Sequence, residues 1–257
     1  MANIVYMAKS AWTGLLDTIR SKASVSGTMT VSEATTAVEN IPSGGGGDEN
    51  FDKLVDRTII EAFNSTVTTI GKYAFAYCSK LTTVSFANVR IIDNSAFTSC
   101  SSLTTATFPN ATFIYSNAFM SCSSLTTVSF PNVTSIGSSA FVSCNSLTTA
   151  TFPNATSIYS SAFAKCANLT TVSLPNVRSI GASAFSMCYN LLSLYLMGSI
   201  IPTLVNVNAF AYTPISTYTT STSGVNGSIF VPASLYNSYL TATNWSLYSS
   251  RIVSVAE

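Results

Sequence analysis

Charged side chains are scarce in this chain of 257 residues: Asp, Glu, Lys and Arg together make up only 8% of it, and histidine is absent. A soluble globular domain usually carries about 25% charged residues. After Asp93 the next acidic residue is Glu257, so most of the chain lacks the side chains that commonly act as general acid or base. The sequence therefore predicts no catalytic residue and no enzymatic activity.

The low charge also limits the expected partners. The formal net charge is only +1, and Lys and Arg do not cluster, which argues against nucleic-acid binding. No charged residue occurs between Asp93 and Lys165, yet Ser, Thr, Asn and Pro interrupt every apolar run there. A membrane-spanning helix needs about 18–20 consecutive apolar residues, so membrane insertion is not expected. With 47% hydrophobic residues the chain is not expected to be disordered either.

The N-terminal residues lack the pattern of a secretory signal. A basic start followed by an uninterrupted apolar core is missing, because Lys9, Asp17 and Arg20 divide the segment. We therefore expect the chain to stay in the cytoplasm or to leave it by a route other than classical secretion.

A repeat of 22 residues dominates the middle of the chain. An Ala-Phe pair is followed three residues later by Cys, and three residues after that by Leu. The phenylalanines are Phe75, Phe97, Phe119, Phe141, Phe163 and Phe185, and the cysteines are Cys78, Cys100, Cys122, Cys144, Cys166 and Cys188. A period of this length with an L-x-x-V-x-F pattern is typical of a leucine-rich solenoid, in which stacked coils bury a continuous core.

Each repeat predicts one coil of that solenoid. In the segment LTTVSF, alternation places Leu81, Val84 and Phe86 inward and Thr83 and Ser85 outward. A Pro-Asn pair then turns the chain, and a short extended piece such as VTSI crosses the back. We expect the segment SSAFVSC to form about one helical turn, with its Phe and Cys inward. The predicted fold is a mainly β solenoid with right-handed coils and parallel sheets, preceded by a small helical segment.

A second period of two coils lies over the first. Val84, Val128 and Val172 alternate with alanines one coil away. Tyr115 and Tyr159 alternate in the same way with Gly137 and Gly181. The array therefore looks like the product of duplicating a double coil.

The repeat resembles a known family. The signature I-G-x-x-A-F-x-x-C-x-x-L-x-x-V-x-F-P over residues 58–213 is similar to the BspA-type leucine-rich repeats of bacterial and viral surface proteins. The resemblance implies adhesion and protein binding at the cell surface in some members. It implies no catalytic residues and no cofactor.

The six cysteines are interpreted as reduced thiols in the core. Stacked coils bring equivalent Cα atoms within disulfide range, but the side chains point the same way, and pairing would make identical coils inequivalent. A spacing of one coil also differs from the C-x₂₋₄-C pairs of zinc sites. Disulfides and a metal site remain the alternatives, and no metal site is predicted.

The outward residues of the predicted strands form a regular grid of hydroxyls. The grid consists of Thr83, Ser85, Thr105, Thr107, Thr127, Ser129, Thr149, Thr151, Thr171 and Ser173. It is a candidate binding face for a protein or a glycan. Two alternatives are hydroxyls that only keep an uncharged surface soluble, and the threonine array of an ice-binding solenoid.

The segments on either side of the repeats predict four units. Residues 1–43 read as two short helices that dock to other subunits, and residues 44–57 as a glycine-rich linker and polar N-terminal cap. Residues 58–213 form the solenoid, and residues 214–257 a cap of strand, short helix and strand. Trp12, Leu15, Leu16 and Ile19 share one helical face, which we expect to contact another chain or another copy.

The helix pair followed by glycines resembles the N-terminal segments of phage tail and tail-fibre-associated proteins. Together these features predict a non-enzymatic structural and recognition protein, a component of a phage or prophage virion whose partners are other virion subunits or a host surface protein or glycan. Its expected location is the virion, or the cytoplasm before assembly. The alternative is a bacterial adhesin of the BspA type at the cell surface.

Overall fold

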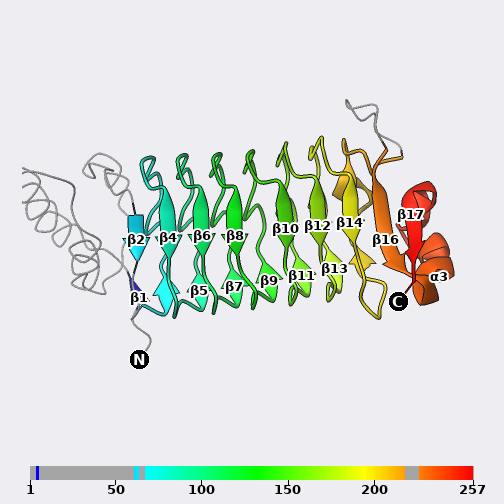
Figure 1. Cartoon of the computed structure of the whole chain (residues 1–257), viewed down its shortest axis with the longest axis horizontal. Coiled ribbons are helices and arrows are strands. Elements are labelled where there is room, and N and C mark those ends of the chain that lie inside the picture. Colours follow the sequence, from blue (N-terminus) through cyan, green and yellow to red (C-terminus); the bar gives the residue numbers. More distant parts are fainter. Residues whose placement is uncertain (1–3, 6–60, 64–66, 218–225, 257) are drawn as a thin grey trace, which may run out of the picture.

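The chain folds into a solenoid whose coils stack along its long axis (Figure 1). The computed structural model describes residues 4–5, 61–63, 67–217 and 226–256. Within these ranges almost every coil contributes one short strand to a back sheet and one to the front, and all strand pairs are parallel. The predicted mainly β repeat solenoid is confirmed.

The back sheet is continuous from one end of the solenoid to the other. Its strands, in spatial order, are β1 (Ile4–Val5), β3 (Thr69–Ile70), β5 (Ile91–Ile92), β7 (Phe113–Ile114), β9 (Ser135–Ile136), β11 (Ser157–Ile158), β13 (Ser179–Ile180) and β15 (Thr203–Leu204). From β3 to β13 each residue pairs with the residue one repeat later, as Ser135 does with Ser157. At the N-terminal edge Ile4 and Val5 pair with Thr69 and Ile70, so two residues of the predicted docking segment extend this sheet.

The front of the solenoid consists of two sheets. The first contains β2 (Glu61–Phe63), β4 (Thr83–Ser85), β6 (Thr105–Thr107) and β8 (Thr127–Ser129). The second contains β10 (Thr149–Thr151), β12 (Thr171–Ser173), β14 (Ser193–Tyr195), β16 (Ser228–Pro232) and β17 (Ile252–Val255). No strand pairing joins β8 to β10 in the described residues, and we call this interruption the seam.

The segment around each Ala-Phe pair forms tight turns, so the expected helical turn is wrong. In one coil Ser139 and Ser143 both have left-handed backbone conformations, with φ of 57° and 60°. The amide of Phe141 donates to the carbonyl of Ala162 in the next coil at 2.7 Å, instead of to a residue of its own coil. A helix directs its N–H groups along its own axis, whereas here alternate N–H groups bond between coils and left-handed residues turn the chain back.

Two columns of phenylalanine rings run through the core. In the first column the rings of Phe75, Phe97, Phe119, Phe141, Phe163, Phe185 and Phe210 stack with centroids 5.0 to 5.6 Å apart. In the second, Phe86, Phe108, Phe130 and Phe152 stack in the same way, and the two columns meet edge to face or tilted, as Phe97 and Phe108 do. The predicted inward residues Leu81, Val84 and Phe86 are fully buried. Each coil thus needs its neighbours to cover its apolar side.

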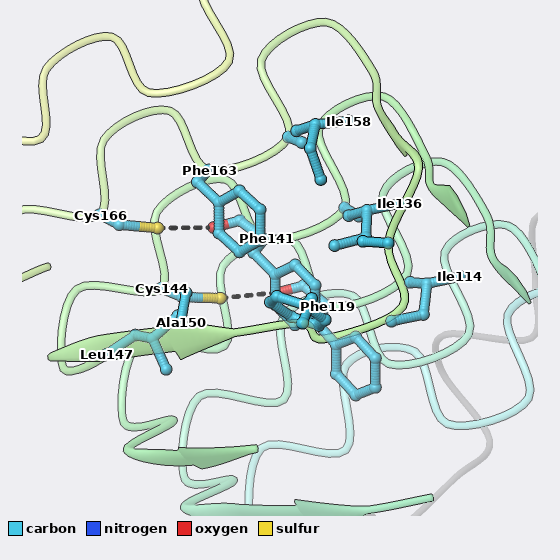
Figure 2. Close-up of a cluster of buried hydrophobic side chains, with 14 of the residues drawn as sticks. Ile114, Phe119, Ile136, Phe141, Cys144, Leu147, Ala150, Ile158, Phe163 and Cys166 are labelled. Atoms are coloured by element: carbon cyan, nitrogen blue, oxygen red, sulfur yellow. Dashed lines mark hydrogen bonds between the residues drawn. The ribbon is translucent and has the colours of Figure 1, made fainter. Parts of the chain in front are cut away.

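All six cysteines are buried thiols beside the first column. Each Sγ from Cys100 onward donates a hydrogen bond to the carbonyl oxygen of the phenylalanine in the preceding coil, at 3.0 to 3.2 Å. Figure 2 shows two of these bonds, from Cys144 to Phe119 and from Cys166 to Phe141. The placement of the cysteines in the core is confirmed, and their reduced state stays a prediction.

An aromatic cluster closes the C-terminal end. Between β16 and β17 lie α3 (Tyr236–Thr241) and the 3₁₀ helix Ser246–Arg251. Tyr239, Trp245 and Tyr248 are buried, and Trp245 Nε1 donates to the carbonyl of Pro202 at 2.7 Å. Tyr248 packs edge-on against Phe210, the last ring of the first column. These rings cover the core at the last described coil. Among the described residues no helix has the length and apolar character needed to cross a membrane.

Candidate functional site

The structure places the predicted hydroxyl grid on the outward side of the front strands. In β10 the central Ala150 is buried, whereas Thr149 and Thr151 on either side are exposed. The parallel register aligns each grid residue with its equivalent one coil away, for example Thr149 with Thr171 and Thr151 with Ser173. The local alternation of the sequence is therefore sufficient to place these hydroxyls outward.

The seam divides the grid into two groups. Thr83, Ser85, Thr105, Thr107, Thr127 and Ser129 lie on the first front sheet, and Thr149, Thr151, Thr171 and Ser173 lie on the second. At the seam Val128 is only half-buried, whereas the equivalent Val84 and Val172 are fully buried. Phe130 and Phe152 are 6.1 Å apart, compared with 5.6 Å for the earlier pairs of the same column. The coils thus separate slightly at the front while the back sheet holds them together.

Threonine hydroxyls just before the strands have a structural role that the grid hydroxyls do not share. Thr104, Thr126 and Thr170 each donate to a backbone carbonyl of the preceding coil, at 3.0 to 3.2 Å. The turn asparagines act similarly; Asn132 Nδ2 donates to the carbonyl of Pro109 at 2.7 Å. In the described part of the chain the grid side chains make no such bond, so their hydroxyls are directed to solvent and available to a ligand.

The outward row ends in an aromatic pair that the sequence reasoning did not identify. Tyr195 occupies the position of Ser173 one coil later, and Phe230 and Val253 continue the row on β16 and β17. The rings of Tyr195 and Phe230 stack at 4.6 Å with their planes 13° apart. Both side chains are half-buried on the front surface. The repeat spacing alone places Tyr195 in this row, but Phe230 follows an insertion and cannot be aligned by period.

The thiols offer no catalytic chemistry. Burial raises the pKa of Cys122, Cys144 and Cys188, which keeps them protonated and weakly nucleophilic. In the described ranges no three residues of the types His, Cys, Asp and Glu gather in a way that could hold a metal ion. The arrangement can present hydroxyls and aromatic rings to a partner.

The predicted assembly contact lies outside the described residues. It consists of Trp12, Leu15, Leu16 and Ile19, on the first of the two expected helices, and it stays a prediction.

The stacked coils, the buried Leu and Phe positions and the parallel sheets define a leucine-rich repeat solenoid. A family model described as the BspA type leucine-rich repeat region matches residues 47–112 and 112–231. The chain belongs to this BspA-type leucine-rich repeat family.

The solved structures that match this chain include three leucine-rich repeat proteins. A leucine-rich repeat protein from T. pallidum is 30% identical, with a TM-score of 0.54 over 57% of this chain and 74% of that one. A leucine-rich repeat protein from Bacteroides ovatus is 24% identical, with a TM-score of 0.47 over 65% of this chain and 50% of that one. A leucine-rich cell surface protein from Faecalibacterium prausnitzii is 19% identical, with a TM-score of 0.28 over 77% and 78% of the two chains. A search of curated proteins gave no match.

Proposed function

We propose that this protein is a non-enzymatic recognition module that binds a protein partner through the front of its solenoid. The observation that carries the proposal is the stacked pair of Tyr195 and Phe230, which faces outward beside the hydroxyl grid. Protein interfaces commonly combine a few large aromatic anchors with a polar rim. The grid residues Ser173 and Thr171 supply that rim on the neighbouring strand.

The composition of the front face favours a protein over a charged ligand. The grid carries only hydroxyls, and none of the front strands from β4 to β17 contains a charged residue. Such a surface lacks the potential that attracts nucleic acid or phosphorylated groups. An apolar pair surrounded by uncharged donors and acceptors suits instead a partner with an apolar projection and exposed polar backbone groups.

Substitution by the residues that other coils carry tests this proposal. Tyr195→Ser combined with Phe230→Thr restores the hydroxyl pattern of the row and removes both rings, and the outward position should leave the fold intact. Affinity capture with the purified chain, read by quantitative mass spectrometry, should recover partners with the native protein and lose them with the double variant. Leu247→Ser removes an exposed apolar side chain away from this row and is the matched control. Equal recovery by native and doubly substituted protein would contradict the proposal.

We further propose that the module is displayed on a phage or prophage virion and attached through residues 1–43. The support is in the sequence: two short amphipathic segments, followed by Gly44–Gly47 as a hinge. In this arrangement the helical segment binds the particle, while Ile4 and Val5, which pair with β3, keep the start of the chain on the first coil of the solenoid. Display on a bacterial cell surface, as an adhesin, is the alternative.

Fractionation of a lysogenic host distinguishes the two locations. Mass spectrometry of purified particles should detect the full chain, and deletion of residues 1–47 should remove it from particles while the solenoid remains folded by circular dichroism. Recovery of the full chain in the cell envelope, with none in particles, would identify the adhesin instead.

A further inference from the structure

The back of the solenoid carries exposed aromatic rings at a spacing of two coils. Tyr115 follows β7 and Tyr159 follows β11, and their side chains are 44% and 53% exposed. The ring of Phe113, which is 43% exposed, lies 6.4 Å from that of Tyr115. Large aromatic side chains are usually buried, so three exposed rings on one surface point to a ligand.

Backbone packing keeps the space between the two tyrosines clear. Gly137 occupies the equivalent position in the intervening coil, and its amide donates to the carbonyl of Ile114 at 2.7 Å. A Cβ added at Gly137 would lie 2.6 Å from the carbonyl carbon of Tyr115, which is too close for any side chain. Gly181 is held against Tyr159 in the same way. The alternation of Tyr and Gly along the double repeat therefore places a tyrosine ring in every second coil and no side chain at the equivalent position between the rings.

Uncharged hydroxyls lie beside the surface between the two tyrosine rings. Ser135 and Ser157 follow Phe113 in the outward row of the back sheet, one coil apart. Both are half-buried, and neither side chain makes a hydrogen bond within the described part of the chain. In the coil before Tyr115 the equivalent position is Asp93, whose carboxylate accepts from the amide of Asn94. The exposed Arg90 of the same coil offsets this carboxylate, and no charged residue occurs between Asp93 and Lys165, so the surface offers no net charge to an anionic ligand.

We propose that the surface formed by Phe113, Tyr115, Ser135, Ser157 and Tyr159, which we call the back platform, binds an extended neutral oligosaccharide. A sugar ring has an apolar C–H face that stacks on an aromatic ring and a rim of hydroxyls that exchange hydrogen bonds with serine. Two coils span on the order of 10 Å. A pyranose residue in an extended β-1,4-linked chain advances by nearly the length of one coil, so every second sugar falls over a tyrosine and the sugar between them over Gly137. This site is separate from the front face, and either proposal can fail without the other.

Calorimetric titration of the full chain with named hexasaccharides tests the back platform. Cellohexaose, chitohexaose and mannohexaose are the neutral probes, and hexagalacturonate is the anionic one. We expect at least one neutral probe to bind, and Tyr115→Ala and Tyr159→Ala each to weaken its binding about tenfold or more. Tyr159→Phe keeps the stacking ring and should bind like the native chain. Tyr189→Ala removes an exposed tyrosine away from the platform and is the matched control.

The outcomes separate the proposal from its competitors. Thermal melting should show the tyrosine variants folded as the native chain is, because the substituted rings are largely exposed. The proposal is overturned if no neutral hexasaccharide binds, if hexagalacturonate binds more tightly, or if the alanine variants bind as the native chain does. It is also overturned if Tyr115→Ala and Tyr159→Ala abolish capture of a protein partner but leave sugar binding unchanged.

Discussion

At the scale of single residues, the recurrent cysteine has a specific role, because its thiol hydrogen-bonds to the backbone of the preceding coil. The carbonyl oxygen of Phe119 accepts the amide of Cys122 in its own coil and the thiol of Cys144 in the next. A thiol is small and apolar enough to be buried and still satisfies the second lone pair of that carbonyl. Alanine at this position would fill less of the space and leave the second lone pair of the carbonyl oxygen without a hydrogen-bond donor.

Native thiols should be almost unreactive toward a disulfide-exchange reagent such as Ellman's reagent. All six are buried, and burial raises the pKa of Cys122, Cys144 and Cys188, so few thiolates form at neutral pH. Titration after denaturation without reductant should give six thiols per chain, the number in the sequence. A denatured count below six, or rapid reaction of the native protein, would contradict the buried reduced state.

The same thiols should make the fold less stable in alkaline solution. A thiol in the unfolded chain has a pKa of about 8.5, whereas burial raises the pKa of the Cys144 thiol in the native protein. Below that pH the Cys144 thiol is protonated in both the native and the unfolded state, so its contribution to the free energy of unfolding is fully present. Above that pH the unfolded state releases the proton first, so the free energy of unfolding falls as pH rises. Cys144→Ala should reduce this slope by up to about 1.4 kcal/mol per pH unit.

Urea denaturation between about pH 7 and 9.5 measures the two slopes within the range in which thiols titrate. Comparing slopes rather than absolute free energies removes the constant effect of the smaller side chain. Parallel pH dependences for the native chain and Cys144→Ala would show that this thiol does not contribute.

At the scale of secondary structure, the two sides of the solenoid differ in continuity. The back strands have only two residues each, but they pair without a break from β1 to β15. The front strands are longer, yet the ladder stops at the seam between β8 and β10. Since the first phenylalanine column keeps its spacing there, with Phe119 and Phe141 5.2 Å apart, the core and the back sheet hold the two halves together.

Hydrogen exchange should detect the seam. The amides of Thr170 and Thr171 donate to the carbonyl of Thr148, and Thr126 and Thr127 donate to that of Thr104. In the described residues no equivalent bond joins Thr148 or Thr149 to Thr126. The amides of Thr148 and Thr149 should therefore exchange faster than those of Thr170 and Thr171, which hold the same positions one coil later and serve as the internal control. Equal protection at both positions would mean that the front ladder is continuous in solution.

At the scale of the whole molecule, stability depends on contact between neighbouring coils. Phe141 stacks on Phe119 and Phe163 at 5.2 and 5.1 Å and also meets the second column at Phe130 and Phe152. No coil encloses its own apolar residues, so removing one ring affects three consecutive coils. The aromatic cap supplies the same cover at the C-terminal end.

Two substitutions in adjacent parts of the solenoid should differ strongly in their effect. Phe141→Ala leaves a cavity in the column and should lower the free energy of unfolding by about 3–5 kcal/mol. Thr149→Ala removes an exposed hydroxyl and should change it by less than about 0.5 kcal/mol. Chemical denaturation of both variants provides the comparison, and similar losses of stability would mean that inside and outside were assigned wrongly.

Features that are local and periodic could be predicted from the amino-acid sequence alone. The period fixed one coil per repeat, the alternation in LTTVSF separated Val84 from Thr83 and Ser85, and the fixed Phe-Cys spacing placed both residues in the core. These features follow from the direction of each side chain on a strand or a turn, which depends on only a few neighbouring residues. For the same reason the hydroxyl grid was identified residue by residue.

Features that depend on contacts between coils, or on residues distant in the chain, could not be predicted in this way. Helical spacing and tight turns both bring Phe141 and Cys144 inward, and only the hydrogen bond from Phe141 to the next coil selects the turns. Tyr195 and Phe230 meet because β16 pairs with β14 across an insertion that breaks the period. The seam and the pairing of β1 with β3 likewise depend on how complete coils stack. The repeat period and the alternation of residues carry no information about the distances between coils, because the side chains of two coils together determine how these coils stack.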